Sequence, residues 1–394
     1  MLKYTNFILT KKDNGMETNQ KQQEIPLDLN DLMAKAKDAF KEATQGICSK
    51  LNVLMVGKTG VGKSTLINAV FGEKAAKTGS GKPVTQEISE IKVNPNFSIY
   101  DTKGLEMKDF EFIYADIANF LEEDSKKRAD EQIHIVWFCV AEPGRRIEEG
   151  EKKLFDLFGQ KDYTTIVAIT KAQQDKDENG ENFSDKVKSE FGINDKYTQR
   201  VVALEIEDDD GNIKPLKGID ELIKKTYNAL PEASKQAFAR EQKYNKDVKY
   251  EAALDIINKY SVAAGAIAVN PLPFSDIALL LPTQIAMITH ITHNYGFEAS
   301  AENIAKLAAS FAAVAAGGFA VRFLAGNLLK FIPAVGSVAG GAFNVTVASS
   351  TTKLMGNAYL AYLNDNFELI YKGDFDLFSN LTDTIIKAYV EKLK

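Results

Sequence analysis

The sequence predicts an α/β domain with a mainly parallel sheet, followed by an all-α C-terminal domain. Apolar runs of strand length alternate with amphipathic helical stretches between residues 51 and 230. No strand pattern continues after Leu230, and only six charged residues occur between Ser261 and Ser350. Alternating strands and helices favour a parallel sheet, because each connecting helix packs back onto one of its two faces.

Length and composition are those of a folded chain with two or three domains. The 394 residues are 26% charged and 45% hydrophobic, and the net charge of −6 gives no overall basic field. Nucleic acid is therefore not an expected partner. Cys48 and Cys139 form no CxxC pair, and three histidines are too few for a zinc constellation, which fits a reducing cytoplasm. Residues 1–15 carry no long apolar stretch, so we expect no signal peptide.

The elements are expected in the following order. Residues 1–28 are polar and predict a flexible tail, and residues 29–48 predict a leading helix with Asn30 as its N-cap. Residues 49–230 form the α/β domain and residues 231–394 the helical domain. Within the α/β domain we expect strands at 51–57, 86–93, 97–101, 132–142, 163–171 and 200–207, and helices at 64–71, 109–121, 148–158 and 218–230.

A phosphate-binding loop is indicated between the first strand and the helix that follows it. The segment GKTGVGKS fits the pattern G-x-x-x-x-G-K-[ST] in the strand–loop–helix context that this pattern requires. The glycines let backbone amides approach phosphates, Lys63 reaches the outer phosphates, and the Ser64 hydroxyl can ligate Mg²⁺. The predicted nucleotide contacts are Gly57, Lys58, Thr59, Gly60, Val61, Gly62, Lys63, Ser64 and Thr65.

Two further segments predict the rest of a magnesium site and a switch. Asp101 and Gly104 form a D-x-x-G pattern at the end of the strand FSIYD, where the carboxylate can hold Mg²⁺ through water and the glycine amide can sense the third phosphate. Thr85 lies in a Gly-rich connection from which its hydroxyl could reach the same metal. The predicted metal ligands are Ser64, Thr85 and Asp101, and the predicted catalytic residues are Lys63, Thr85 and Gly104.

These motifs together resemble the translation-factor-related GTPase class, in particular its Era-like and septin-like branch, typified by GKTGVGKSTLINA. The resemblance covers about residues 50–230 and implies a Mg²⁺-dependent switch that binds GTP and hydrolyses it to GDP and phosphate. Guanine reading in this class uses N-K-x-D, which appears here as Thr170, Lys171, Ala172 and Gln173. Asp175 follows two positions late, so the resemblance implies base contacts from Thr170, Lys171 and Asp175, or a weakened preference for guanine.

The fifth motif and the catalytic glutamine also depart from the class. The fifth motif would fall near Val202–Leu204, where only a backbone amide remains for the base. Leu105 follows Gly104 where many switch GTPases place a water-orienting Gln, and an apolar side chain cannot orient water. The resemblance therefore implies slow hydrolysis, completed by a partner, by self-association or by another group. The candidate groups are Lys58, Thr59, Glu106, Arg145 and Arg146, although arginines in such a position are more often solvated loop charges or helix-flanking contacts.

The apolar segment 261–350 leaves two interpretations open. Its stretch NPLPFSDIALLLPTQIAMI resembles an uncharacterised helical domain that follows many bacterial Era-like GTPases and also occurs in inner-membrane proteins. Charge-free runs at 277–297 and 331–352 are nominally long enough for a bilayer of about 30 Å. Their Pro, His, Asn and Ser residues disfavour simple spans, so buried helices of a water-exposed domain are the other interpretation.

The sequence thus predicts a GTP-dependent switch that controls an apolar helical domain. Its expected partners are GTP and GDP, with a homodimer and a membrane surface as further candidates. The expected location is cytoplasmic, with peripheral contact at the inner membrane as an option. The alternative is an assembly or scaffold protein with negligible turnover, in which the bound nucleotide controls dimer formation. RNA binding by the segment AFAREQKYNKDVK is disfavoured, because acidic residues offset its basic ones.

Overall fold

The computed structural model divides the chain into two compact units. The sheet unit contains Cys48–Ala252 and Asn294–Gly296, and the helical unit contains Met1–Ile47, Ala253–His293 and Phe297–Lys394. The sheet unit thus includes residues 231–252, which the sequence analysis assigns to the helical domain. The structure describes residues 38–39, 41, 43, 50–72, 75, 82–85, 87–104, 110–207, 211–267, 276–297, 300, 303–304, 307, 340–372 and 376–393. The predicted tail 1–28, Leu105, Glu106 and much of 261–350 lie outside these residues.

The sheet unit contains a seven-stranded sheet in the order β2-β3-β4-β1-β5-β6-β7. Strands β4, β1, β5, β6 and β7 are parallel, whereas β2 and β3 add an antiparallel edge. The strands are β1 Leu51–Val56, β2 Lys82–Pro83, β3 Ile88–Asn94, β4 Phe97–Thr102, β5 Ile135–Ala141, β6 Thr165–Thr170 and β7 Thr198–Arg200. The predicted α/β class is confirmed, and β1 lies in the middle of the sheet, where chain order reverses.

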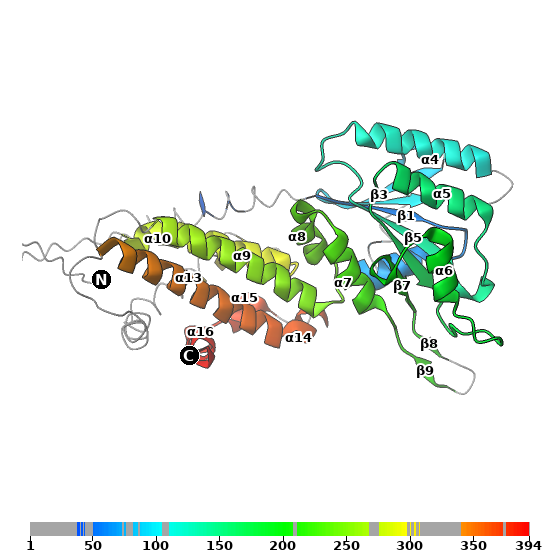
Figure 1. Cartoon of the computed structure of the whole chain (residues 1–394). Helices are drawn as coiled ribbons and strands as arrows, with labels where there is room; N and C mark the ends of the chain where they lie inside the picture. Colours follow the sequence, from blue (N-terminus) through cyan, green and yellow to red (C-terminus); the bar gives the residue numbers. More distant parts are fainter. Residues whose placement is uncertain are drawn as a thin grey trace, which may run out of the picture. The chain divides into compact units, whose positions relative to one another are not determined.

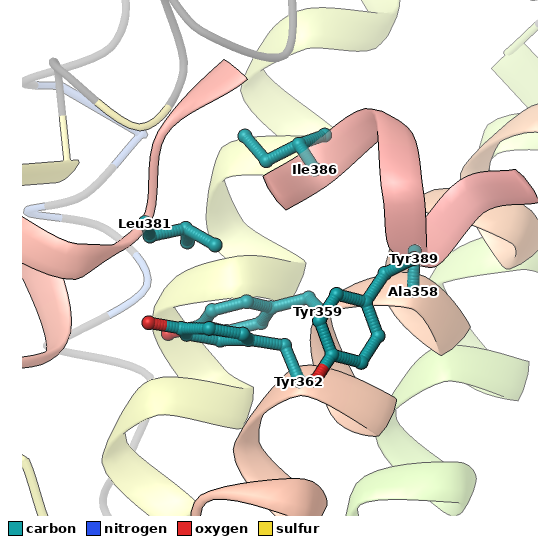
Figure 2. Close-up of a pocket in the computed structure, with 6 residues that line it drawn as sticks. All are labelled: Ala358, Tyr359, Tyr362, Leu381, Ile386 and Tyr389. Atoms are coloured by element: carbon teal, nitrogen blue, oxygen red, sulfur yellow. The ribbon is translucent and has the colours of Figure 1, made fainter. Parts of the chain in front are cut away.

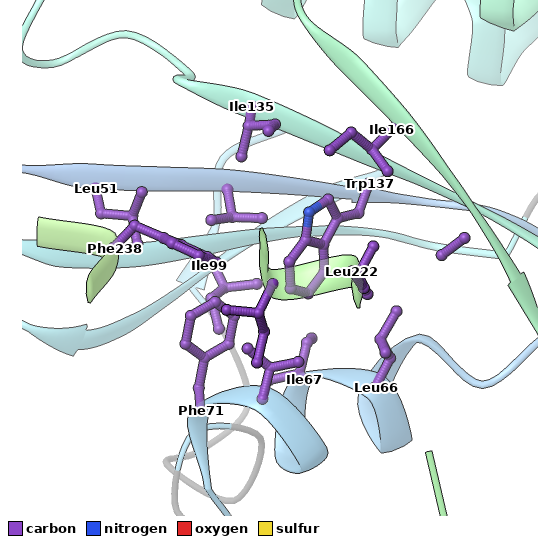
Figure 3. Packing of buried hydrophobic residues seen from close by; sticks show 14 of the residues in the cluster. Leu51, Leu66, Ile67, Phe71, Ile99, Ile135, Trp137, Ile166, Leu222 and Phe238 are labelled. Atoms are coloured by element: carbon purple, nitrogen blue, oxygen red, sulfur yellow. The ribbon is translucent and has the colours of Figure 1, made fainter. Parts of the chain in front are cut away.

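Helices cover both faces of the sheet (Figure 1). The helices of the sheet unit are α2 Lys63–Phe71, α4 Phe110–Ser125, α5 Glu149–Gln160, α6 Phe183–Phe191, α7 Ile219–Ala229 and α8 Glu232–Glu241. One core gathers side chains of α2, α7 and α8 on one face, and a second gathers those of α4, α5 and α6 on the other. Trp137 is fully buried in the first core, and its indole Nε1 donates to Thr226 Oγ1 at 3.1 Å (Figure 3).

The segment expected as a strand at 200–207 is divided differently in the structure. The strand that pairs with β6 is β7, and it ends at Arg200. Residues 206–207 instead form β8 Ile206–Glu207, which pairs with β9 Ile213–Lys214 in a separate hairpin. Helix α6 lies in a polar stretch for which the sequence predicts no strand or helix; its three buried residues, Phe183, Val187 and Phe191, are four apart and share one helix face.

Lys249 explains why residues 294–296 group with the sheet unit. Its side chain is fully buried, and its Nζ donates to the carbonyls of Ala239, Arg240 and Asn294 at 2.6, 3.0 and 3.1 Å. Asn294 returns a bond from its amide to the Lys249 carbonyl at 2.9 Å. Burial lowers the pKa of Lys249 well below its ordinary value. This buried lysine joins the end of α8 to the residues around Asn294.

The helical unit is built mainly from long helices. They are α9 Lys246–Ile267, whose first residues belong to the sheet unit, α10 Asp276–Asn294, α13 Gly340–Asp365, α14 Phe367–Lys372, α15 Leu377–Asn380 and α16 Asp383–Lys392. His290 of α10 bonds both the Tyr260 hydroxyl at 2.9 Å and the Ala43 carbonyl at 3.0 Å. Residues 38, 39, 41 and 43 are themselves helical.

The end of this unit contains a small apolar hollow between α13 and α16 (Figure 2). Its walls are Ala358, Tyr359, Tyr362, Leu381, Ile386 and Tyr389. The Tyr359 hydroxyl is within 2.7 Å of Thr292 Oγ1, which links α13 to α10. Among the helices that the structure describes, none has both the length and the apolar character to cross a bilayer.

Candidate nucleotide site

The predicted phosphate-binding loop forms the turn between β1 and α2. Gly57, Gly60 and Gly62 all have positive φ, of 150°, 75° and 103°. Gly62 caps α2 in the left-handed conformation, and a Cβ on Gly57 would lie 2.5 Å from the Cys139 carbonyl oxygen. Glycine is therefore required here by backbone conformation and by the close approach of β5. The loop ends at the N-terminus of α2, where free amides favour an anion.

Lys63 and Asp101 place one positive and one negative charge at this loop. Lys63 Nζ donates to the Gly57 carbonyl at 2.8 Å and to the Lys58 carbonyl at 3.5 Å. Asp101 lies on β4 opposite Met55 of β1. Burial raises the pKa of its carboxyl, while the charge of Lys63 opposes this shift. Its Oδ1 is buried and accepts no hydrogen bond from the described residues.

This arrangement fits a hydrated Mg²⁺ ion. A buried carboxylate oxygen without a donor is costly unless a cation or a water molecule satisfies it. The nearby Ser64 is exposed at the start of α2. One carboxylate and one hydroxyl, with water and phosphate oxygens as remaining ligands, are the usual environment of Mg²⁺. The residues present therefore suit the predicted metal at Ser64 and Asp101.

Gly104 packs directly against the phosphate-binding loop. A Cβ at this position would lie 1.7 Å from Thr59 Oγ1, 2.4 Å from Thr59 N and 2.6 Å from Thr59 Cα. The Lys103 amide donates to the Glu87 carbonyl at 2.7 Å, which fixes the segment that leads to Gly104. The structure thus brings Gly104 to the loop, and sensing of the third phosphate by its amide stays a prediction.

Thr85 is bonded elsewhere. Its Oγ1 donates to Asp116 Oδ2 of α4 at 2.5 Å and accepts the Ile88 amide at 3.0 Å. Asp116 Oδ2 also accepts the Glu87 amide at 3.0 Å. In this conformation the Thr85 hydroxyl joins the first residue of β3, Ile88, to Asp116 of α4. To ligate a metal, Thr85 must first break its bond to Asp116. The sequence analysis does not identify Asp116, because a carboxylate within an amphipathic helix carries no local sign of a long-range partner.

Thr170 braces the loop from the end of β6. Its buried hydroxyl donates to the Val61 carbonyl at 2.6 Å, with the Val140 carbonyl 3.3 Å away. Lys171, next along the chain, is exposed and has a positive φ of 54°. Thr170 therefore supports the loop backbone, and Lys171 is left with a side chain that can extend along a bound base.

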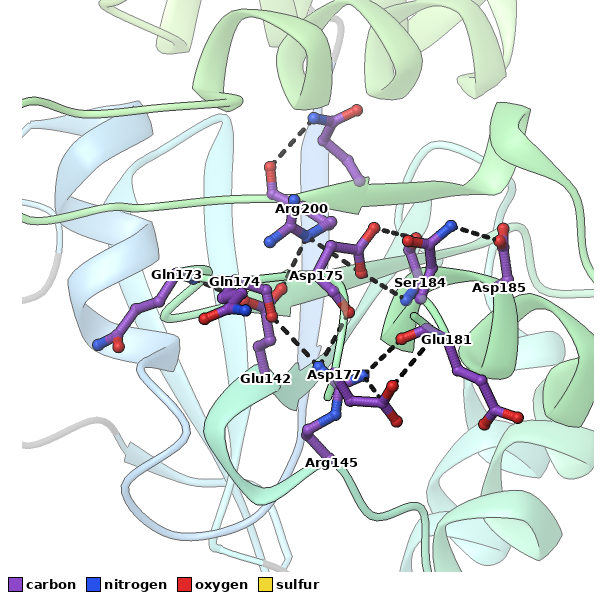
Figure 4. A network of polar contacts seen from close by, with 12 residues as sticks. Glu142, Arg145, Gln173, Gln174, Asp175, Asp177, Glu181, Ser184, Asp185 and Arg200 are labelled. Atoms are coloured by element: carbon purple, nitrogen blue, oxygen red, sulfur yellow. Dashed lines mark hydrogen bonds and ion pairs between the residues drawn. The ribbon is translucent and has the colours of Figure 1, made fainter. Parts of the chain in front are cut away.

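Asp175 belongs to a polar network at the same edge of the sheet (Figure 4). Its Oδ2 accepts the Ser184 hydroxyl at 2.6 Å, and its Oδ1 accepts the Ser184 amide at 2.9 Å. Burial tends to raise the pKa of Asp175, but the Ser184 hydrogen bonds and the charge of Arg200 bring it below its ordinary value. Contact between this carboxylate and a base requires it to exchange these partners.

Glu142 and Arg145 complete this network. Glu142 is buried. Its carboxylate accepts hydrogen bonds from the backbone amide of Gln173 at 2.5 Å and from Arg200 Nε at 2.7 Å. The Arg145 guanidinium donates to the carbonyls of Gln174, Asp175 and Glu181. Arg145 thus holds the loop that follows β6. Glu142 was not predicted as a site residue, although its position at the end of a strand pattern, at 132–142, places it at this edge.

At the expected fifth motif, near Val202–Leu204, the backbone of Val202 is hydrogen-bonded to another part of the fold. Val202 N donates to the Lys217 carbonyl at 2.8 Å, and Lys217 N donates back to the Val202 carbonyl at 3.0 Å. Leu204 is 60% exposed. The Val202 amide is therefore already bonded, and a contact with the base falls to residues after it.

Replacing Thr170 with Val tests the bracing contact. Removing the hydroxyl leaves the buried Val61 carbonyl without this donor, so we expect the free energy of unfolding to fall by about 1–2 kcal/mol. Nucleotide affinity should fall several-fold, equally for GTP and ATP. Thr170→Ser, which keeps the hydroxyl, is the control. A loss confined to GTP, measured by competitive displacement, would instead assign Thr170 to the base.

Two segments of the chain match family models of known proteins. Residues 52–171 match the family model described as 50S ribosome-binding GTPase, and residues 234–374 match a domain of unknown function, DUF697. The sheet unit has the P-loop GTPase fold. Septin-8 of Xenopus tropicalis is 31% identical over 131 residues, which cover 27% of this chain and 30% of that protein.

One further relative and one solved structure are also similar to this chain. Magnetosome membrane protein 22 of Magnetospirillum gryphiswaldense is 29% identical over 140 residues, covering 36% of this chain and 67% of that protein. The crystal structure of Toc33 from Arabidopsis thaliana with GDP and Mg²⁺ has 17% identity and a TM-score of 0.32, covering 50% of this chain and 90% of that one. The chain spans about a third of the length of the septins it matches.

Proposed function

We propose that the chain binds Mg²⁺–GTP at residues 57–65 and hydrolyses it to GDP and phosphate as a molecular switch. The observation that carries this proposal is that one glycine loop brings together the Lys63 ammonium, which bonds the Gly57 carbonyl, and the buried, donor-free Oδ1 of Asp101, whose carboxyl is within the electrostatic influence of Lys63. The match to a GTPase family model over residues 52–171 supports it. Similarity to septins favours the Era-like and septin-like branch.

The residues of the site have separate roles in this proposal. The loop amides and the α2 N-terminus bind the phosphates, and the Lys63 ammonium exchanges the Gly57 carbonyl for an outer phosphate oxygen. Ser64 and Asp101 would hold the Mg²⁺ ion, which neutralises charge on the outer phosphates. Thr85 would change partner from Asp116 to the metal, and Gly104 would sense the third phosphate from its position on Thr59.

Phosphate release by the wild-type chain tests this function. We expect Mg²⁺-dependent but slow turnover of GTP, because the apolar Leu105 replaces a water-orienting residue. The rate of phosphate release per chain should rise with protein concentration if a second copy completes the site. Tight GTP binding without measurable turnover at any concentration would contradict hydrolysis and support the assembly or scaffold alternative.

Base preference is a separate prediction. If Lys171 with Asp175 or a neighbouring acid reads guanine, GTP should displace a fluorescent GTP analogue at least about 100-fold better than ATP, as a charged bidentate contact is lost with adenine. Asp175→Asn should reduce this ratio if Asp175 exchanges Ser184 for the base. Equal displacement by both nucleotides would show that the site does not read guanine.

The helical unit is proposed to respond to the nucleotide at a membrane surface. The low charge of residues 261–350 and the similarity to a magnetosome membrane protein support peripheral contact at the inner membrane of a cytoplasmic protein. Flotation with liposomes should differ between GDP and a non-hydrolysable GTP analogue, and Leu280→Asp should reduce it without affecting nucleotide binding. A chain that stays monomeric and never floats in either state would contradict membrane control.

A further inference from the structure

The side chain of Lys58, in the phosphate-binding loop, is bound by two carboxylates at the start of α5. Its Nζ lies 2.8 Å from Glu148 Oε1 and 3.0 Å from Glu151 Oε2. Burial tends to lower the pKa of Lys58, but the hydrogen bonds and charges of both glutamates raise it above its ordinary value. The lysine therefore stays charged while it is bound at the start of α5.

The two glutamates are positioned by the helix they cap. Glu148 is the N-cap of α5 and Glu151 lies in its first turn, and the two form a capping box in which the Glu148 amide donates to Glu151 Oε2 at 2.9 Å. The Glu151 side chain is 3% exposed, whereas that of Glu148 is 37% exposed. Glu151 is thus the buried partner of Lys58, and Glu148 is the more exposed one, whose side chain also accepts the Glu151 backbone amide in the capping box.

The backbone of Lys58 nevertheless lies within the nucleotide site. Its carbonyl accepts the Val61 amide at 3.3 Å and lies 3.5 Å from Lys63 Nζ. A lysine has a long flexible stem, so its ammonium can leave the start of α5 and move toward a phosphate bound at the loop. A phosphate would then compete with the two carboxylates for the same charge.

We propose that Glu148 and Glu151 form a latch that holds Lys58 off the nucleotide, and that its release adds a cation beside the third phosphate. The proposal rests on the function proposed above, that GTP binds at residues 57–65. The latch sets the balance between the GTP-bound and GDP-bound states, because only GTP offers the additional phosphate charge to compete with the two carboxylates. Glu148 and Glu151 are positioning residues that act through Lys58.

The double variant Glu148→Gln/Glu151→Gln tests the latch. Glutamine is accepted at N3 of a capping box, and at the N-cap its amide oxygen can still accept a backbone amide, so the start of α5 should persist. We expect the affinity for a non-hydrolysable GTP analogue, relative to GDP, to rise about fivefold, which is the scale of one partly exposed ion pair. Glu149→Gln is the matched control, since Glu149 is an exposed neighbour and its replacement removes a negative charge from the same turn.

The same two substitutions are then made in a Lys58→Met variant. This comparison separates release of Lys58 from a simple loss of repulsion between the two carboxylates and the phosphates. The gain must disappear there if it depends on the lysine, and an equal gain in that background would overturn the latch. A second measurement needs no nucleotide: acetylation of lysines followed by mass spectrometry should modify Lys58 several-fold faster in the double variant, with exposed Lys161 as internal reference. Unchanged Lys58 reactivity would also overturn it.

The two proposals can fail separately. If the wild-type chain binds no GTP, the proposed function fails and the latch fails with it. If the wild-type chain binds GTP but the double variant leaves both the GTP-to-GDP affinity ratio and the Lys58 reactivity unchanged, the latch alone is overturned.

Discussion

Lys63→Ala should abolish nucleotide binding while leaving the fold intact. Lys63 Nζ donates a hydrogen bond to the Gly57 carbonyl within the loop. From there the ammonium can exchange this carbonyl for a phosphate oxygen. A charge-assisted hydrogen bond is worth about 1.5–3 kcal/mol, and this lysine would contact more than one phosphate oxygen. We therefore expect the dissociation constant for labelled GTP to rise at least about 100-fold.

Lys161→Ala is the control for this loss. Lys161 is an exposed lysine at the end of α5, so its removal changes the net charge equally without touching the loop. Circular dichroism melting should give similar transitions for Lys161→Ala and the wild type and only a small shift for Lys63→Ala, because Lys63 bonds loop carbonyls and its charge also acts on Asp101. Unchanged GTP affinity in Lys63→Ala would show that the loop is not the nucleotide site.

Gly104→Ala should also remove nucleotide binding, for a steric reason. The new methyl group would stand 2.4 Å from the Thr59 nitrogen and 2.6 Å from its Cα, distances that only a displaced backbone can relieve. Either the loop or the segment 103–104 must shift, so the phosphate-binding amides lose their arrangement. We expect affinity for GTP to fall about 30-fold or more, since several amide contacts depend on this geometry.

Gly144→Ala is the matched control, because a Cβ at Gly144 meets no heavy atom within 4 Å. It should bind GTP as the wild type does. Thr59→Ala should not rescue Gly104→Ala, since it removes only the hydroxyl and leaves the two backbone contacts. Normal GTP affinity in Gly104→Ala would mean that Gly104 tolerates a side chain and is not closely packed on the loop.

The sheet was predictable because its strands are nearly continuous apolar runs. All residues of β1 and β6 are buried, which is the pattern of a parallel strand covered on both faces. Helix α6 could not be predicted in the same way, because Phe183, Val187 and Phe191 are its only buried residues. These three residues are four apart and share one helix face, but over a short polar segment they are a weaker signal than a continuous apolar run.

The phosphate-binding loop was predictable because its residues are consecutive. The spacing of Gly57, Gly62 and Lys63 specifies the turn without help from distant segments. The partners of Thr85 and Asp175 were not predictable, because Asp116 and Ser184 lie on helices and become neighbours only through the fold. The sequence thus locates the phosphates better than it locates the base or the resting partners of the switch.

The central position of β1 also constrains how the site can assemble during synthesis. β1 pairs with β4 on one side and with β5 on the other, and Val53 pairs with Ile135, 82 residues later in the chain. Gly57 packs on Cys139 of that same strand. Contacts this distant along the chain form late, since the intervening loop must close first. On the ribosome, the strand that packs behind the phosphate-binding loop is therefore absent until β5 has emerged. Until then, the loop lacks the contact between Gly57 and Cys139 and the pairing of β1 with β5.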